Sequence, residues 1–196
     1  MRKTLTTLAI IGSLANPSLA GDESIKDLKE YANYTANFEG RRPKGYDPNP
    51  DDGKPEPTIG VGHYLGRPDS RKTFLETFPN VNYNAVLLGK QELTNEQIDT
   101  LFAVDLPKYV KIAKSFFPKF DSYSLDLRKA LVDGCYRGDI SDSPKTRSLI
   151  IEGKFVEAGI EYTNRDDYRQ APAKGQMGIV HRIQKNRAAI LNESKK

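Results

Sequence analysis

Residues Thr58 to His63 read Thr-Ile-Gly-Val-Gly-His, and this segment carries more information about the fold than any other. Its β-branched residues favour extended backbone, and its two glycines permit turns and close approaches that side chains would block. The residues before it, from Arg41 onward, are rich in Pro, Gly and Asp, which are turn-forming residue types. Residues 41–66 are therefore predicted to form a small antiparallel hairpin with long turns.

A helix is predicted just before this hairpin. Small and apolar residues recur there at spacings of three and four, which places them on one face of a helix. They are Ile25, Leu28, Ala32, Thr35 and Phe38. Glu39 then lies at the C-terminal end of the helix, and Gly40 occupies the position at which helices commonly stop.

A longer helix is predicted from about Thr94 to Ala113. Thr94 and Gln97 have the spacing of a capping box, in which each side chain bonds the backbone of the other residue. Apolar residues continue at helical spacing through Leu106, and Pro107 is expected to kink the helix. Further helices are predicted near residues 124–136, 143–151, 155–162 and 176–191.

These motifs resemble those of the phage-type lysozymes, glycoside hydrolase family 24. The family pattern is Glu-Gly, then a Tyr and an Asp, then Thr-Ile-Gly-x-Gly-His. This chain has Glu39-Gly40, Tyr46-Asp47 and residues 58–63 in the same order. Residues 93–105 are similar to the family's Leu-Thr-x-x-Glu/Gln-x-x-x-Leu-Phe-x-x-Asp helix. Weaker likeness in residues 132–139 and 178–182 extends the resemblance over most of residues 25–190.

The resemblance implies an α+β fold that is predominantly helical. A small N-terminal lobe with an antiparallel β-hairpin would be joined by the long helix to a helical C-terminal lobe, with the substrate cleft between them. The 176 residues after the first 20 suit one domain with a substantial core. We therefore expect a single lysozyme-like domain over residues 21–196.

Residues 1–20 have the pattern of a secretory signal. Arg2 and Lys3 precede an apolar run, and small residues lead up to Ala20, as at a signal peptidase site. The alternative is an uncleaved membrane anchor, but the run is short for a span of about 20 apolar residues. We expect a secreted protein, extracellular or periplasmic, with no membrane span once the signal is removed.

Composition argues against several other kinds of protein. Cys135 is the only cysteine, so an exported chain has no internal disulfide, and a small buried side chain is the simplest interpretation of this thiol. Beyond residue 20 there are 28 bases against 26 acids, a net charge of only +2. The chain has no Trp and no groove-reading motif, so nucleic acid is not an expected partner.

Glu39 is the candidate general acid. An inverting glycosidase places one protonated carboxyl and one carboxylate on opposite sides of the scissile bond, roughly 6.5 to 9.5 Å apart, with a water between. The negative end of a helix dipole and the apolar neighbour Phe38 both favour the protonated form of Glu39.

The second carboxylate is where the chain departs from the family pattern. The family has Tyr-x-Asp and then a short turn, whereas here Asp47 adjoins Tyr46 and Thr58 follows Asp47 by eleven residues. Asp47 is preferred as the general base, on the view that residues 49–56 include an insertion. Asp52 is the alternative, although Asp next to Gly is also common in turns. Thr58 would hold the attacking water together with the aspartate, as the resemblance implies.

Other residues of the hairpin have expected roles. Gly60 and Gly62 are expected to let the strand approach a sugar closely or twist sharply. Tyr64, and also Tyr136, are candidates for stacking on sugars. No metal or cofactor is expected, because His63 and His181 are the only histidines and neither has a partner at ligand spacing. The resemblance instead implies a structural ion pair between His63 and Asp105.

The resemblance implies a muramidase that hydrolyses the β-1,4 bond between N-acetylmuramic acid and N-acetylglucosamine in bacterial peptidoglycan, with inversion. Peptidoglycan is then the expected partner, and a monomer is expected. Defence, digestion of bacteria, attack on competitors and wall remodelling all stay open as biological roles. One rival is a catalytically inactive peptidoglycan-binding module. A second rival, a cationic protein that disrupts membranes, is disfavoured by the low net charge.

Overall fold

The computed structural model describes residues 24–48 and 53–195. The predicted signal and the alternative base Asp52 lie outside these ranges. The chain divides between Pro107 and Lys108 into two compact units, each of which is described by itself. The prediction of a single domain over residues 21–196 stays a prediction.

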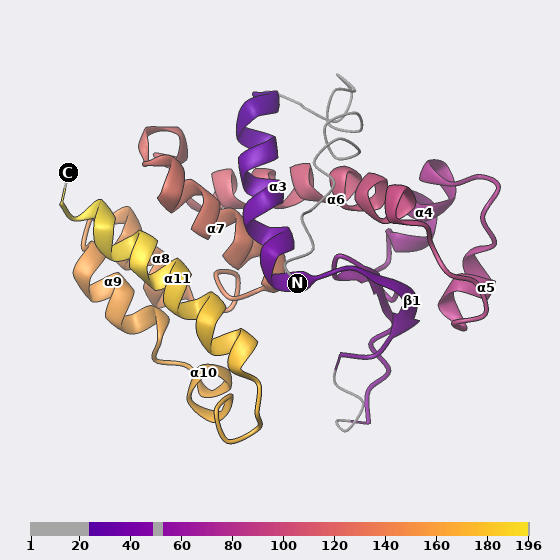
Figure 1. The fold of residues 1–196 in the computed structure, drawn as a ribbon. Coiled ribbons are helices and arrows are strands. Elements are labelled where there is room, and N and C mark those ends of the chain that lie inside the picture. The colour runs from indigo at the N-terminus through magenta and orange to yellow at the C-terminus, as the bar shows by residue number, and fades with distance from the viewer. Residues whose placement is uncertain (1–23, 49–52, 196) are drawn as a thin grey trace. The chain divides into compact units, whose positions relative to one another are not determined.

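In its described part, the first unit contains a three-stranded sheet and the helices that precede the long helix in the chain (Figure 1). Its elements are α3 (Ile25–Glu39), β1 (Arg42–Tyr46), β2 (Thr58–Gly60), β3 (His63–Tyr64), α4 (Ser70–Thr77), α5 (Tyr83–Leu87) and the start of α6 (Asn95–Phe116). The second unit begins within α6, one residue after Pro107.

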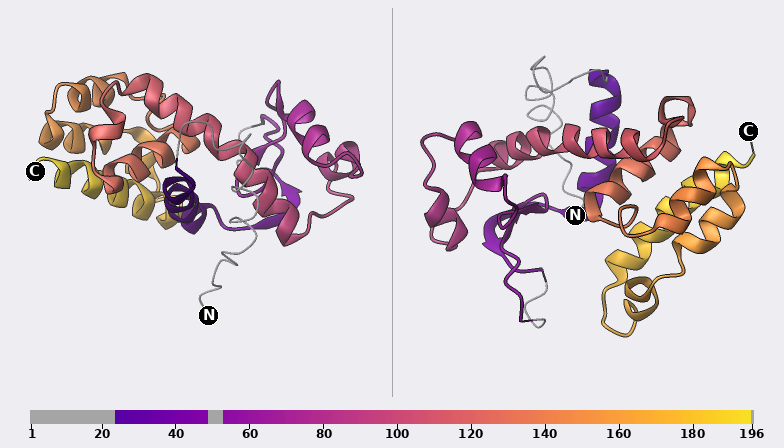
Figure 2. Two further views of the ribbon diagram at one scale, coloured as in Figure 1. Left: turned by 90° about the horizontal axis from the view of Figure 1, so that it is seen from above. Right: turned by 180° about the vertical axis from the view of Figure 1, so that it is seen from behind.

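The second unit is helical throughout its described part. Its elements after α6 are the short 3-10 helix η2 (Phe120–Ser122), α7 (Leu125–Arg137), α8 (Pro144–Ile151), α9 (Phe155–Tyr162), α10 (Asp166–Gln170) and α11 (Met177–Glu193). Helix α11 packs against α7 and α9, and α8 packs against α9, an arrangement that both views of Figure 2 show. The core of this unit therefore forms both between helices that follow one another, α8 and α9, and between helices far apart in the chain, α7 and α11.

The predicted fold class is confirmed: the structure is mostly helical with a small antiparallel sheet. The predicted helices lie within a few residues of α3, α6, α7, α8, α9 and α11. The short helices α4, α5 and α10 were not predicted. Helices α5 and α10 are only five residues long, which is too short for a helical period to stand out in the sequence.

Local chemistry explains where α3 and α6 begin and end. Ser24 caps α3 by accepting a hydrogen bond from the Asp27 N–H at 3.1 Å. The helix ends at Glu39 because Gly40 adopts a φ of +69°, a conformation that glycine reaches without a steric penalty. At α6, the Gln97 N–H donates to Thr94 Oγ1 and the Thr94 N–H donates to Gln97 Oε1, which is the predicted capping box.

The sheet has three antiparallel strands in the order β1-β2-β3. Gly60 and Gly62 have φ values of +67° and +76°, so both glycines serve the tight connection between β2 and β3. A Cβ on Gly60 would lie 3.3 Å from Ile98 Cγ2, which shows that this end of the sheet packs directly on α6. The glycines therefore have a conformational and packing role that needs no ligand.

Candidate active site

Glu39, the candidate acid, is half-buried at the C-terminal end of α3. The chain just after it is held in place, because Arg41 donates from Nε and Nη2 to Asp99 Oδ1 of α6 at 3.0 and 2.6 Å. Asp99 is almost fully buried, so this ion pair fixes the start of β1 against α6. Neither member of the pair was identified from the sequence, since a lone Arg and Asp separated by 58 residues carry no local signal.

Tyr46 lies within reach of the charge of Glu39. Burial raises the pKa of the Tyr46 phenol above its usual value, the negative charge of Glu39 raises the pKa further, and Arg42 opposes both effects. The Arg42 guanidinium carbon lies 5.3 Å from the centre of the Tyr46 ring. Glu39 and Tyr46, which the sequence placed in one motif, are therefore electrostatic neighbours in the fold.

The sheet register sets Thr58 between two tyrosines. Tyr46 pairs directly with Thr58, and Thr58 pairs directly with Tyr64. Directly opposed residues of antiparallel strands lie side by side on one face, so these three residues form a row across the sheet. Thr58 is buried at 6% exposure, and Tyr64 is exposed at 36%.

The ring of Tyr64 lies over Gly66. A Cβ on Gly66 would approach Tyr64 Cζ and the phenol oxygen to 2.4 Å, so a side chain at this position would force the ring away. Tyr64 is thus held against the backbone with one part of the ring exposed, which suits a surface on which a sugar stacks. Tyr136, the other tyrosine considered from the sequence, packs instead against Tyr109 with the ring centres 4.6 Å apart.

Asp47 and Thr58 both form hydrogen bonds with the backbone of Glu56. The Glu56 N–H donates to Asp47 Oδ2 at 3.1 Å, and the Thr58 hydroxyl donates to the Glu56 carbonyl at 2.9 Å. Because the single hydroxyl proton of Thr58 is used in this bond, Thr58 Oγ1 can act only as an acceptor toward another group. The structure therefore brings the preferred base and the candidate water-holding residue together on a common anchor.

Asp47 and Tyr46 also line an open hollow of about 330 Å³. Its other walls come from β1, the end of the loop before β2, and the end of α5 with the turn after it. They are Lys44, Gly45, Pro55, Pro57, Leu87, Leu88 and Gly89. The hollow gives the Asp47 side of the sheet an accessible surface of mixed polar and apolar character, as ligand sites commonly have.

His63 and Asp105 are in contact, with His63 Nδ1 and Asp105 Oδ2 2.5 Å apart and both side chains almost fully buried. Arg67 adds an ion pair to Asp105 Oδ1 at 2.7 Å. Burial alone would raise the pKa of Asp105, but the hydrogen bond and charge of His63 and the charge of Arg67 outweigh it and lower the pKa. The group ties β3 to α6 within the first unit.

His63 Nε2 also lies 2.8 Å from Ser70 Oγ, so Asp105, His63 and Ser70 form a chain like that of a serine hydrolase. Ser70, however, is 0% exposed and is the first residue of α4. A serine nucleophile has to reach the substrate carbonyl, and a fully buried hydroxyl does not. Ser70 therefore fixes the orientation of the His63 ring, a role that the sequence did not reveal.

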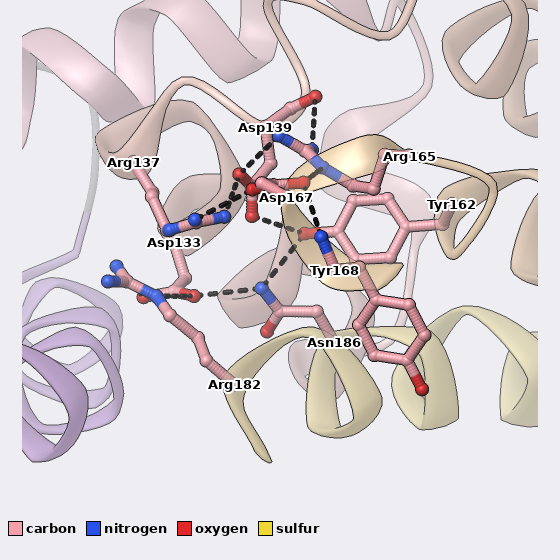
Figure 3. Close-up of polar contacts among 9 residues, drawn as sticks. All are labelled: Asp133, Arg137, Asp139, Tyr162, Arg165, Asp167, Tyr168, Arg182 and Asn186. Atoms are coloured by element: carbon pink, nitrogen blue, oxygen red, sulfur yellow. Dashed lines mark hydrogen bonds and ion pairs between the residues drawn. The ribbon is translucent and has the colours of Figure 1, made fainter. Parts of the chain in front are cut away.

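A buried polar network occupies the middle of the second unit (Figure 3). Arg182 donates from Nε and Nη2 to the two carboxylate oxygens of Asp133, and the Asn186 amide joins Asp133 to the Tyr162 hydroxyl. Tyr162 in turn donates to Asp139, whose carboxylate also pairs with Arg137 and Arg165. Burial raises the pKa of Asp139, against the lowering effect of the arginines. This network links α7, α9 and α11 in the core and was not predicted.

The described residues contain no group of three or more His, Cys, Asp or Glu side chains that could hold a metal ion. Burial raises the pKa of the Cys135 thiol to about 12, so this thiol is not an activated nucleophile. No helix in the described part of the chain has the length and apolar character needed to cross a bilayer.

No protein-family model matches the chain, and no curated protein matches it either. The resemblance to phage-type lysozymes therefore rests on the sequence motifs alone.

Proposed function

We propose that this protein is a secreted muramidase, a glycosidase that cleaves the β-1,4 bond between N-acetylmuramic acid and N-acetylglucosamine in peptidoglycan. The observation that carries the proposal is the joint anchoring of Asp47 and Thr58 on Glu56. The Asp47 carboxylate lines an open hollow, and the Thr58 hydroxyl, which can only accept from another group, bonds to the same residue, Glu56. Glu39 supplies a second carboxyl, whose negative charge helps to raise the pKa of Tyr46. Tyr46 is the neighbour of Asp47 in the chain and of Thr58 in the sheet.

The arrangement suits the activation of a water molecule. A water that donates one proton to Thr58 Oγ1 and the other to Asp47 has its lone pair free to attack the anomeric carbon. As the carbon–oxygen bond to the leaving sugar breaks, Glu39 donates its proton to the departing oxygen. Asp47 takes a proton from the water, whose oxygen forms the new bond. Attack from the face opposite the leaving group inverts the anomeric centre.

The test is the release of reducing sugar from purified peptidoglycan. Glu39→Gln and Asp47→Asn are each expected to lower the rate by about 100-fold or more, as removal of a general acid or base does. Glu76→Gln is the matched control, because Glu76 is an exposed carboxylate of α4 paired only loosely with Lys72. Asp52→Asn is compared in parallel. If Asp52→Asn abolishes activity and Asp47→Asn does not, the general base is Asp52.

A non-catalytic peptidoglycan-binding module is the second candidate. It is favoured by the hydrogen bond that already occupies Asp47 Oδ2, since a structural carboxylate at a loop base makes the same bond. Sedimentation with insoluble wall separates the two candidates. Binding without any release of sugar by the wild type supports the module, whereas release that Glu39→Gln eliminates supports the enzyme.

A further inference from the structure

Two prolines enclose the residue on which Asp47 and Thr58 are anchored. Glu56 stands between Pro55 and Pro57, just before β2 begins. Residues 55–57 belong to no helix or strand, so their conformation has to be fixed by other means. This conformation matters for the candidate site, because Glu56 bonds to Asp47 through its N–H and to Thr58 through its carbonyl.

A proline restricts both itself and the residue before it. Its ring fixes its own φ at about −65°, and its Cδ disfavours the helical region for the preceding residue. Pro57 therefore favours extended backbone at Glu56, whereas Pro55 restricts only itself and Lys54. The carbonyl of Pro57 also accepts a hydrogen bond at 2.7 Å from the N–H of Leu65, the residue after β3.

The extended conformation decides where the two polar groups of the Glu56 backbone point. In extended backbone the N–H and the C=O of one residue face the same edge, whereas in a helix they point in opposite directions along the axis. A change of Glu56 to helical backbone would turn one of these groups away from its partner. Asp47 and Thr58 therefore keep their common anchor while Glu56 stays extended.

We infer that Pro57 is a positioning residue of the proposed glycosidase. It acts through Glu56, because it confines the Glu56 backbone to the conformation that holds Asp47 and Thr58 together. The inference rests on the proposed function, since it concerns the placement of the general base and of the residue that holds the water. Misplacement of a reacting group by about 1 Å can lower a rate by about 100-fold, so a small gain in backbone freedom is measurable.

The first measurement is the steady-state hydrolysis of soluble peptidoglycan fragments by the wild type and Pro57→Ala. Alanine removes the restriction on Glu56. We expect kcat to fall by roughly two- to fivefold, which corresponds to the conformational freedom that one proline removes. KM should stay nearly the same. Pro57 also lines the open hollow, and the loss of a binding contact there would raise KM and leave kcat unchanged, which overturns the positioning role.

Pro79→Ala is the matched control, because Pro79 is an exposed proline in the turn after α4. Both variants are expected to melt about 1–4 °C lower than the wild type, since each loses one proline from the chain. Thermal unfolding therefore shows that both are folded. An equal fall in kcat in the two variants, or no fall in Pro57→Ala, overturns the inference.

A second measurement separates a misplaced base from a general loss of activity. Azide attacks the anomeric carbon without giving up a proton, so it needs no general base. Its nitrogen forms the new bond, the bond to the leaving sugar breaks, and Glu39 protonates the departing oxygen, which gives an inverted glycosyl azide. Azide is expected to accelerate Pro57→Ala by a larger factor than the wild type or Pro79→Ala. A fall in kcat that azide does not relieve overturns the positioning role.

The third measurement needs no activity. Amide hydrogen exchange followed by NMR reports the Glu56 N–H, which is bonded to Asp47, and the Leu65 N–H, which is bonded to the Pro57 carbonyl. Pro57→Ala is expected to speed exchange at Glu56 by roughly two- to fivefold. Unchanged exchange at Glu56 overturns the inference, and so does faster exchange confined to Leu65. A wild type that releases no sugar overturns the proposed function, while faster exchange at Glu56 still supports its restriction by Pro57.

Discussion

At the scale of single residues, the most strongly determined group is the buried cluster of Asp105, His63, Arg67 and Ser70. Asp105 receives hydrogen bonds or ion pairs from both His63 and Arg67, and it is 0% exposed. A buried carboxylate is stable only when its partners compensate the loss of hydration. Each partner therefore contributes to folding, and the lowered pKa of Asp105 makes that contribution depend on pH.

His63→Asn is expected to lower the free energy of unfolding by about 2 kcal/mol at neutral pH, since a hydrogen bond to a charged group is lost. A carboxyl with a lowered folded pKa adds stability above its unfolded pKa of about 3.9, and this stability is lost as the pH falls through the folded pKa. The difference between wild type and variant should therefore shrink below about pH 4. Urea unfolding from pH 3 to pH 7 measures it.

Ser70→Ala is the control for this experiment, because it removes a hydrogen bond between the same imidazole and an uncharged hydroxyl and leaves Asp105 paired. Its effect on stability should change less with pH across the acid range than that of His63→Asn. A difference between wild type and His63→Asn that is constant from pH 3 to pH 7 would show that Asp105 gains no charge stabilisation from His63.

At the scale of elements, the contact between the sheet and α6 depends on a glycine. Gly60 ends β2 with a φ of +67°, and a Cβ there would lie 3.3 Å from Ile98 Cγ2. Two separate costs therefore act against any other residue, the strained backbone conformation and the crowding of Ile98. Thr58 and His63, which flank this turn, take their positions from it.

Gly60→Ala is expected to reduce stability by about 2–3 kcal/mol through both costs together. Gly53→Ala separates them, because Gly53 has a similar φ of +71° and no neighbour within 4 Å of the added Cβ. Its expected cost is about 1 kcal/mol, from backbone strain alone. Denaturant unfolding of both variants is the measurement, and equal losses would mean that the contact with Ile98 adds nothing.

At the scale of the whole molecule, the second unit is organised around buried ions. Asp133 is 0% exposed and Arg182 is 5% exposed, and their side chains are joined by two hydrogen bonds. Removal of one partner of a buried pair leaves an uncompensated charge, whereas replacement of both by apolar residues is often tolerated. The packing of α11 on α7 is therefore expected to be stable when both ions are present or when both are replaced. It is expected to be destabilised when only one of them remains.

Arg182→Met is expected to destabilise the protein by about 3–5 kcal/mol, a large fraction of a typical folding free energy of 5–15 kcal/mol. The double variant Asp133→Leu with Arg182→Met should recover much of that loss. A double-mutant cycle followed by thermal unfolding gives the coupling energy. Losses that simply add would show that the two ions do not stabilise each other.

The elements that could be predicted from the sequence are those whose signals are local. The periodic apolar residues, the capping box at Thr94 and the stop at Gly40 predicted α3 and α6, because helix propagation and capping involve residues only a few positions apart. The motif around Glu39, Asp47 and Thr58 was visible for the same reason. The motif identified candidate residues. It did not show that Asp47 bonds to the N–H of Glu56 and that Thr58 bonds to the carbonyl of the same residue.

The contacts between residues far apart in the chain could not be predicted, because they depend on how the helices and strands pack. The contacts of Ser70 and Arg67 with His63, and the pairing of Asp133 with Arg182, have no sequence signature. Single polar residues far apart in a chain look like ordinary surface residues until packing removes water from around them. Burial then decides their partners, because a charge or hydroxyl that has lost its hydration is stable only where another group replaces it.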